Sequence, residues 1–409
     1  MNSFTLIKEG EIALKSVFES FEEIAFKNQE KVLDAFRSNR IRDVHFNTSS
    51  GYGYGDIGRD DLEQVFADIF YAENAMVRGQ IVSGTHAISA CLFGLLRTGD
   101  HLISLTGKPY DTLGHIIGNE NPARGTLVER GINYTEIDLT PVGHVDLAAI
   151  EKAIHRNTKM VLIQRSRGYN HRPALTIQDI SDIIRVVRKG NPKTIIFIDN
   201  CYGEFTDLKE PVEIGADLVA GSLIKNAGGG LALSGGYIAG KHDLVEEVAC
   251  HVTAPGLGKE LGASLMNNRL LYQGLFLAPH VVLQALKSAA LLSYVFEQLE
   301  YEVYPHWNAS RGDIVQAVQL NSPEKVIEFT QIVQRYSPID SDVNLEFAEL
   351  PGYDDQVIMA AGTFVQGSSI ELSCDAPLRS PYTAYFQGGL TYEHTRYVIA
   401  KLADSFMNK

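Results

Sequence analysis

IIFIDN at residues 195–200 and DLVAGSLIKN at residues 217–226 are the two segments that decide the fold of this chain. Both are short apolar runs bounded by turn-forming residues, a pattern typical of strands buried on both faces of a sheet. The first run ends at Asp199, and the second leads to Lys225. Because the carboxyl ends of parallel strands meet at one edge of a sheet, we expect the acid and the amine to share that edge.

The chain around these segments alternates between strand-like and helix-like patterns. Apolar runs occur at 76–82, 101–105, 134–138, 160–165, 194–199, 217–224 and 235–239, and helical stretches at 85–97, 110–117, 146–154 and 176–189 lie between most of them. This alternation predicts an α/β fold with a large, mostly parallel sheet covered by helices on both faces.

Three parts follow from these patterns: an N-terminal helical segment (1–47), a large α/β domain (48–278) and a smaller C-terminal α+β domain (279–409). Helices are expected around 264–275 and from 279 to about 299. For the small domain the patterns predict strands at 302–304, 314–320, 357–361 and 369–373, with helices at 323–334 and 391–406. Runs of strands with separate helices are typical of α+β structure.

Composition limits the classes of function. The formal net charge of −14 argues against nucleic acid or an anionic membrane as the main partner, because both would repel the chain. The four cysteines are scattered, and the N-terminus carries Glu9 and Glu11 where a signal peptide needs cations and an apolar run. We therefore expect a cytoplasmic protein that does not span a membrane. No metal-binding motif is present, so no catalytic metal is expected.

A set of polar residues follows the predicted strands. Ser83, Gly84 and Thr85 come after the first strand and open a helix, whose N-terminal N–H groups can bind an anion; simple helix capping is the alternative. A lysine such as Lys225 can have a lowered pKa and act as an amine nucleophile, although most lysines only reach solvent. With Ser222 and Asp199, these residues are the parts that a pyridoxal 5′-phosphate (PLP) enzyme needs: an amine, a phosphate site and an acid for the ring nitrogen.

A glycine-rich segment, GYGYGDIG at 51–58, satisfies the pattern G-x-G-x-x-G. A dinucleotide site also needs a preceding buried strand, and residues 43–47 are a poor candidate. The alternatives are a flexible loop that ends at a helix N-cap, or an arm that carries Tyr54 and Arg59 towards another site.

Four motifs, in this order along the chain, resemble those of the cystathionine/methionine γ-lyase family of PLP enzymes. They are SGTHAI at 83–88, Tyr110 within GKPYDT, Asp199-Asn200, and ADLV…SLIK at 216–225. The sequences GYGYGD at 51–56 and TFVQGSSIELS at 363–373 are similar to those of one branch of the family, labelled aluminium-resistance or methionine γ-lyase-like proteins.

The resemblance implies a PLP-dependent enzyme of fold type I whose active sites are shared in a homodimer or homotetramer. Lys225 would form the Schiff base, Asp199 would pair with the pyridine nitrogen, and Tyr110 would stack on the ring. The phosphate would be held by Ser83, Gly84, Thr85 and Ser222, with His86 either beside the cofactor or filling the loop. The expected activity is carbon–sulfur β- or γ-elimination on a cystathionine- or methionine-like amino acid. Other PLP reactions (racemisation, aldol cleavage, γ-replacement) and a non-catalytic PLP-fold binding module are the alternatives.

Two departures from the family pattern concern the substrate and the partner subunit. In the family, a Y-x-R pair from the neighbouring subunit binds the phosphate of the cofactor. The nearest equivalents in this chain are Tyr54 and Arg59. Glu371 stands where the family has the arginine that binds the substrate carboxylate, and a glutamate cannot do so. We expect Arg379, or secondly Arg167, to take that role; a structural ion pair is the alternative for Arg379.

Overall fold

A seven-stranded sheet forms the centre of the larger part of the molecule in the computed structural model, which describes residues 2–120, 123–170, 172–265 and 268–407. Its strands lie in the order β1-β7-β6-β5-β4-β2-β3, and all run parallel except β7. Their bounds are β1 Asn74–Arg78, β2 His101–Ser104, β3 Asn133–Glu136, β4 Thr158–Gln164, β5 Ile195–Asp199, β6 Leu218–Ser222 and β7 Gly236–Gly240. The predicted mostly parallel sheet is therefore confirmed.

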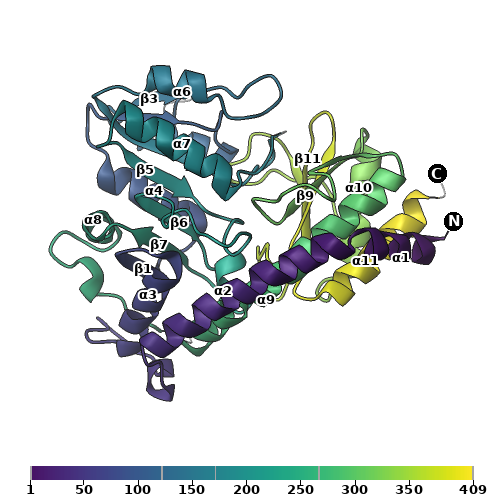
Figure 1. Ribbon diagram of the computed structural model, residues 1–409, viewed down its shortest axis with the longest axis horizontal. Helices are drawn as coiled ribbons and strands as arrows, with labels where there is room; N and C mark the ends of the chain where they lie inside the picture. Colours follow the sequence, from purple (N-terminus) through teal and green to yellow (C-terminus); the bar gives the residue numbers. More distant parts are fainter. Residues whose placement is uncertain (1, 121–122, 171, 266–267, 408–409) are drawn as a thin grey trace.

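Helices cover both faces of this sheet (Figure 1). The covering helices are α3 Ile57–Phe70, α6 Leu147–Ala153 and α7 Ile177–Gly190 on one face, and α4 Gly84–Leu95, α5 Asp111–Ile117 and α8 His242–Val252 on the other. Successive residues of a central strand, such as Ile196 and Phe197, are fully buried in the two different cores. Burial on both faces explains why the central strands are unbroken apolar runs in the sequence.

A second sheet of five antiparallel strands forms the smaller part, with strand order β10-β11-β12-β9-β8. Its elements are β8 Glu302–Tyr304, β9 Val315–Gln319, α10 Pro323–Arg335, β10 Val357–Ala360, β11 Ser373–Pro377, β12 Thr383–Gln387 and α11 Tyr392–Phe406. The strand predicted at 369–373 is wrong, because β11 begins only at Ser373, and β12 was not predicted. The Glu371 carboxylate accepts hydrogen bonds from the backbone of Phe364 (2.8 Å) and Val365 (2.9 Å), which holds the segment before β11 as a loop.

One long helix, α9 Asn268–Gln298, joins the two parts. The two helices predicted on either side of Pro279 are in fact one, since a proline removes a single backbone donor and α9 is buried along its length. The predicted boundary at residue 279 lies inside this helix. Among the described residues α9 alone is long and apolar enough to cross a membrane, but 67% of its apolar window is buried within the protein, as in a core helix.

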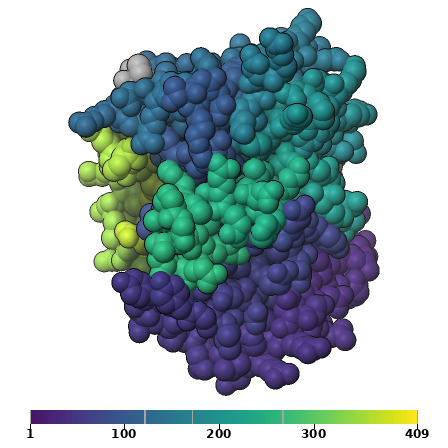
Figure 2. Space-filling view, turned by 90° about the vertical axis from the view of Figure 1, so that its left-hand side faces the viewer, coloured from purple at the N-terminus to yellow at the C-terminus, as the bar shows by residue number. Residues whose placement is uncertain are grey.

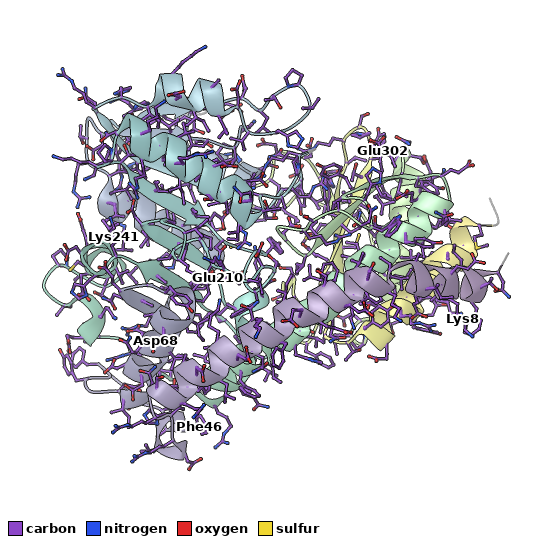
Figure 3. All side chains as sticks on the ribbon, in the orientation of Figure 1. Lys8, Phe46, Asp68, Glu210, Lys241 and Glu302 are labelled. Atoms are coloured by element: carbon purple, nitrogen blue, oxygen red, sulfur yellow. The ribbon has the colours of Figure 1, made fainter. Side chains whose placement is uncertain are left out.

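The N-terminal segment spans both parts of the molecule. It consists of α1 Ser3–Ala13, α2 Lys15–Ser38 and the 3₁₀ turn η1 Asp43–Phe46. Helix α2 packs along α9, and α1 packs against α11 (Figure 1). Figure 3 places Lys8 at the small-domain end of this segment and Phe46 at the opposite end. The segment therefore holds the two sheets in one arrangement.

Residues 48–56 meet the segment that precedes α9 on one face of the molecule (Figure 2). The Gly262 backbone N–H donates to the Tyr52 carbonyl (3.0 Å), and the Ser49 N–H donates to the Ser264 hydroxyl (3.0 Å). Asp56 caps helix α3 by accepting from the Arg59 N–H (3.0 Å). The residues before this segment form a 3₁₀ turn, η1, and no strand, so the glycine-rich motif lacks the strand–loop–helix setting of a dinucleotide site.

Candidate functional site

A cavity of about 230 Å³ lies at the carboxyl edge of the large sheet. Ser83 follows β1, Tyr110 follows β2, Asp199 ends β5, Ser222 ends β6, and Lys225 comes three residues later. All five line this cavity. The predicted meeting of Asp199 and Lys225 at one edge is confirmed, and the parallel pairing of β5 with β6 is its cause.

One end of the cavity is built to receive an anion. The Ser83 hydroxyl caps α4 by accepting from the His86 N–H (3.0 Å) and keeps its own O–H available as a donor. A Cβ on Gly84 would lie 3.1 Å from both the Cys201 Sγ and the Ser222 Cβ, a tighter contact than most side chains make, so glycine suits the close approach of this helix to β6. The N–H groups of the first helical turn and the nearby hydroxyls, including that of Thr85, point to a phosphate.

The acid and the amine lie deeper in the cavity. Asp199 is 4% exposed and accepts from the Cys201 N–H (3.1 Å). Burial raises the pKa of Asp199, and the charge of Lys225 partly opposes that shift. The Lys225 Nζ lies 3.8 Å from the centre of the Tyr202 ring, which holds a cation well.

The surroundings of Lys225 do not lower the pKa of its amine. Burial lowers the pKa of this amine, but the negative charge of Asp199 opposes that effect, and the net shift of the pKa is upward. An ammonium held beside a buried carboxylate is stabilised by the pair's mutual attraction. The charge of Asp199 therefore favours the protonated form of the amine.

Tyr110 forms one wall beside the anion site. Its backbone N–H donates to the Gln164 Oε1 (3.1 Å), and its hydroxyl lies 3.4 Å from the Thr85 hydroxyl. Burial raises the pKa of the Tyr110 phenol, and the Asp199 charge adds to the shift. The phenol therefore stays protonated and remains a donor.

The donor set of this cavity fits PLP. Hydroxyls and a helix N-terminus suit the phosphate, the Asp199 carboxylate suits a protonated ring nitrogen, and the Lys225 amine suits the aldehyde. The three kinds of group line a single cavity in which Gly84 leaves room for them.

Three residues that were predicted to contact the cofactor do not line this cavity: His86, Arg59 and Tyr54. His86 accepts from the Val82 N–H (3.2 Å) and stabilises the loop. Arg59 is 3% exposed and donates to the carbonyls of Gly53 (2.7 Å) and Gly262 (2.9 Å), so it supports the glycine-rich loop. Tyr54 is 64% exposed on that loop, and its role towards a second subunit stays a prediction.

The two arginines expected at the substrate differ in position. Arg379 lines the cavity, pairs with Asp355 (3.1 Å) and donates to the Tyr169 carbonyl (3.3 Å). Arg167 is 1% exposed, donates to the carbonyls of Tyr304 and Asn170, and is outside the described residues that line the cavity. Arg379 is therefore the arginine within reach of a ligand.

Sequence reasoning did not find the front wall of the cavity. Tyr169, Tyr202, Tyr353 and Asp375 line it, and Asp375 is 6% exposed. The only local signal is an acid inside an apolar strand, Cys374-Asp375-Ala376, which is unusual for a buried position. Its relation to Lys225 is not visible along the chain.

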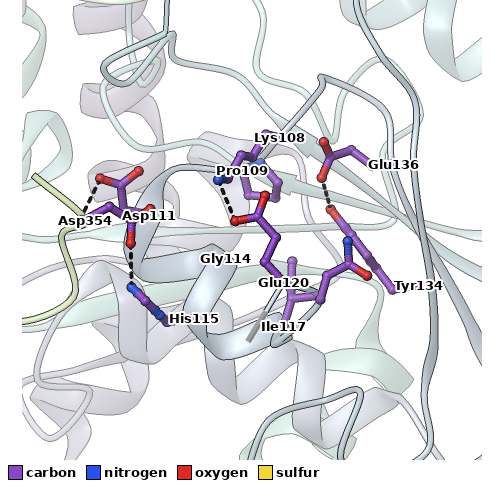
Figure 4. Close-up of a pocket in the computed structure, with 11 residues that line it drawn as sticks. Lys108, Pro109, Asp111, Gly114, His115, Ile117, Glu120, Tyr134, Glu136 and Asp354 are labelled. Atoms are coloured by element: carbon purple, nitrogen blue, oxygen red, sulfur yellow. Dashed lines mark hydrogen bonds and ion pairs between the residues drawn. The ribbon is translucent and has the colours of Figure 1, made fainter. Parts of the chain in front are cut away.

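A second pocket opens beside the cavity and shares Asp111 with it (Figure 4). Its charged groups are already paired: Lys108 with Glu120 (2.9 Å), His115 with Asp354 (3.2 Å) and the Tyr134 hydroxyl with Glu136 (3.1 Å). No cluster of His, Cys, Asp or Glu in the described part of the chain could hold a metal ion.

Comparison with known proteins agrees with this geometry. The family model described as methionine gamma-lyase matches residues 3–407. An uncharacterized protein of Bacillus subtilis is 50% identical over 98% of this chain and 96% of its own length. A structure from Listeria monocytogenes, provisionally assigned as a cystathionine beta-lyase involved in aluminium resistance, is 49% identical, with a TM-score of 0.95 over 97% of this chain and 98% of that one.

A carbon-sulfur lyase involved in aluminium resistance from Clostridium novyi NT is similar as well. It is 48% identical, with a TM-score of 0.94 over 100% of this chain and 96% of its own. The architecture is that of the PLP-dependent fold type I enzymes, with a separate smaller antiparallel sheet. The chain therefore belongs to the methionine gamma-lyase family of carbon–sulfur lyases, as the resemblance of its motifs predicted.

Proposed function

We propose that this protein is a PLP-dependent lyase that cleaves a carbon–sulfur bond in an amino acid by β- or γ-elimination. The observation that carries the proposal is the convergence of Lys225, Asp199 and the N-terminus of α4 on one cavity. When bound there, PLP supplies an aldehyde that links to an amine and a ring that withdraws electrons from the substrate α-carbon.

Six side chains of the cavity have a definite task in this proposal. Ser83, Thr85 and Ser222 would hold the phosphate, and Asp199 would keep the ring nitrogen protonated. Lys225 would carry the cofactor and then move the proton of the substrate α-carbon, because its amine is inside the cavity. The Tyr110 phenol, which burial keeps protonated, would donate a proton to the departing sulfur.

The substrate carboxylate would be bound by Arg379, whose planar guanidinium suits a carboxylate. The acid at position 371 does not compete for this role, since both of its oxygens accept backbone N–H groups. Tyr54, exposed on its loop, would contribute to the site of a second subunit in a homodimer or homotetramer.

The test begins with the purified protein loaded with PLP. We expect a visible absorbance band that borohydride removes, and loss of this reducible band in Lys225→Ala. Lys209→Ala, an exposed lysine paired with Glu213, is the control and should keep the band. A reducible band that persists in Lys225→Ala would show that another amine holds the cofactor.

Product analysis then decides the reaction. Ammonia, a 2-oxo acid and a thiol from a sulfur amino acid indicate elimination. Exchange of the α-hydrogen alone would indicate racemisation, and formation of a new thioether would indicate γ-replacement. The changed residue at position 371 motivates testing these alternatives, since a glutamate stands where the family has the arginine for the substrate carboxylate.

A further inference from the structure

Asp375 is a buried acid in the cavity that the proposed chemistry does not use. It lies on β11 and lines the front wall. Its Oδ2 accepts from the Tyr169 hydroxyl (3.1 Å) and from the Gln387 Nε2 (3.0 Å). Its Oδ1 is buried and has no hydrogen-bond partner among the described residues. A carboxylate oxygen left without a donor is costly to bury, so a donor from a ligand would stabilise it.

No cation forms a direct ion pair with this carboxylate among the described residues. The charge of Lys225 lowers the pKa of Asp375 but also acts on Asp199, and Arg379 pairs with Asp355 at 3.1 Å. Burial raises the pKa of Asp375 to about 6, so the group is ionised above that pH. A buried negative charge calls for a positive partner.

Aromatic rings surround the same place. The centre of the Tyr169 ring lies 5.8 Å from that of Tyr353 and 5.1 Å from that of Tyr385. Tyr169, Tyr202 and Tyr353 line the cavity together with Asp375. Tyrosine faces attract cations, and rings grouped around an acid are a typical way to bind an ammonium group.

We propose that Asp375 determines substrate specificity by binding a protonated amine on the side chain of the substrate. The inference rests on the proposed function and names its substrate class: sulfur-containing amino acids that carry a second, distal ammonium group. Amino acids with a neutral alkyl tail, including methionine, are then poorer substrates. Their methyl groups would leave the Asp375 oxygen unpaired.

The test compares two substrates of the same length, S-(2-aminoethyl)cysteine and S-propylcysteine, which differ by an ammonium in place of a methyl group. Elimination with water gives pyruvate, ammonia and the corresponding thiol from each. We expect kcat/KM to favour the amine by about tenfold or more in the native enzyme. In Asp375→Asn the ratio should fall to about one, since the amide carries no charge.

Asp182→Asn is the matched control, because Asp182 lies on α7 outside the residues that line the cavity. It should keep the native preference. An equal loss for both substrates in Asp375→Asn would overturn the proposal and indicate a proton-transfer or structural role. A native enzyme without preference for the amine would overturn it without any variant.

A binding measurement separates this inference from the proposed reaction. Calorimetric titration of the PLP-loaded protein with lysine and norleucine, which contain no carbon–sulfur bond, should show lysine binding about tenfold more tightly. If lysine is preferred while no sulfur amino acid is cleaved, the proposed reaction is wrong and the ammonium site stands. If sulfur amino acids are cleaved while lysine and norleucine bind equally, the ammonium site is wrong.

Discussion

The rear and front walls of the cavity are built in different ways. The rear wall (Ser83, Asp199, Ser222 and Lys225) comes from strand ends of a single sheet. The front wall (Tyr169, Tyr202, Tyr353 and Asp375, with Arg379 beside it) combines loops after β4 and β5 with β11 and the loops around the small sheet. One sheet fixes the rear wall, whereas the front wall depends on how the two sheets lie against each other.

Hydrogen bonds between the two parts keep the front wall in place. The Tyr169 carbonyl accepts from the Tyr385 hydroxyl (2.8 Å) and from Arg379 (3.3 Å). The Thr112 hydroxyl donates to the Gly352 carbonyl (3.2 Å), next to Tyr353. Changes in the rear wall should therefore affect every substrate equally, and changes in the front wall should distinguish substrates.

Asp199→Asn should have the largest effect of the changes considered below. An amide cannot hold the ring nitrogen protonated as a carboxylate does, so we expect kcat to fall by about 10²–10³-fold for all substrates. Steady-state kinetics on the aminoethyl and propyl substrates checks this, with the absorbance band measuring cofactor occupancy. A fall in kcat for only one of the two substrates would contradict the expectation that the rear wall affects all substrates equally.

Arg379→Lys should have a smaller effect, seen mainly in KM. A lysine keeps the charge but loses the paired N–H groups that bind a carboxylate, so we expect KM to rise about tenfold to fiftyfold with kcat little changed. Titration with amino acids and with the corresponding amines, which lack the carboxylate, provides the control. An unchanged KM would assign Arg379 to its ion pair with Asp355 alone.

The pH dependence of the amine preference should show the smallest effect. Burial raises the pKa of Asp375 to about 6, and the groups that face it are Lys225 and the phenols of Tyr169, Tyr202 and Tyr353. Burial raises the pKa of each of these phenols, so they stay neutral. As the pH falls through that value Asp375 becomes protonated and loses its charge, while the substrate amine remains an ammonium.

We therefore expect the kcat/KM ratio of the aminoethyl to the propyl substrate to fall about fivefold to tenfold between pH 7 and pH 5. The ratio removes effects on catalysis that both substrates share. A ratio that rises as the pH falls would contradict a negatively charged Asp375.

Particular residues show how far sequence reasoning reached. Asp199 and Lys225 could be placed because each ends or follows a buried strand, and parallel strands bring such ends together. Arg59 could not be judged from the chain, since its guanidinium reaches carbonyls at Gly53 and Gly262, and the second lies far away in sequence. The direction of the pKa shift of Lys225 depends on acidic groups that other segments bring around it, so the apolar sequence beside Lys225 could not indicate it.

The sequence by itself determined the mostly parallel sheet, the rear wall of the cavity and the family, because buried strands and their polar ends are local patterns. Only the tertiary structure decided the front wall. Asp375 lies 150 positions from Lys225 (375 − 225) and meets it through the docking of one sheet on another, so no spacing along the chain encodes the contact. The unpaired oxygen of Asp375 and the rings beside it exist only once both parts are folded together.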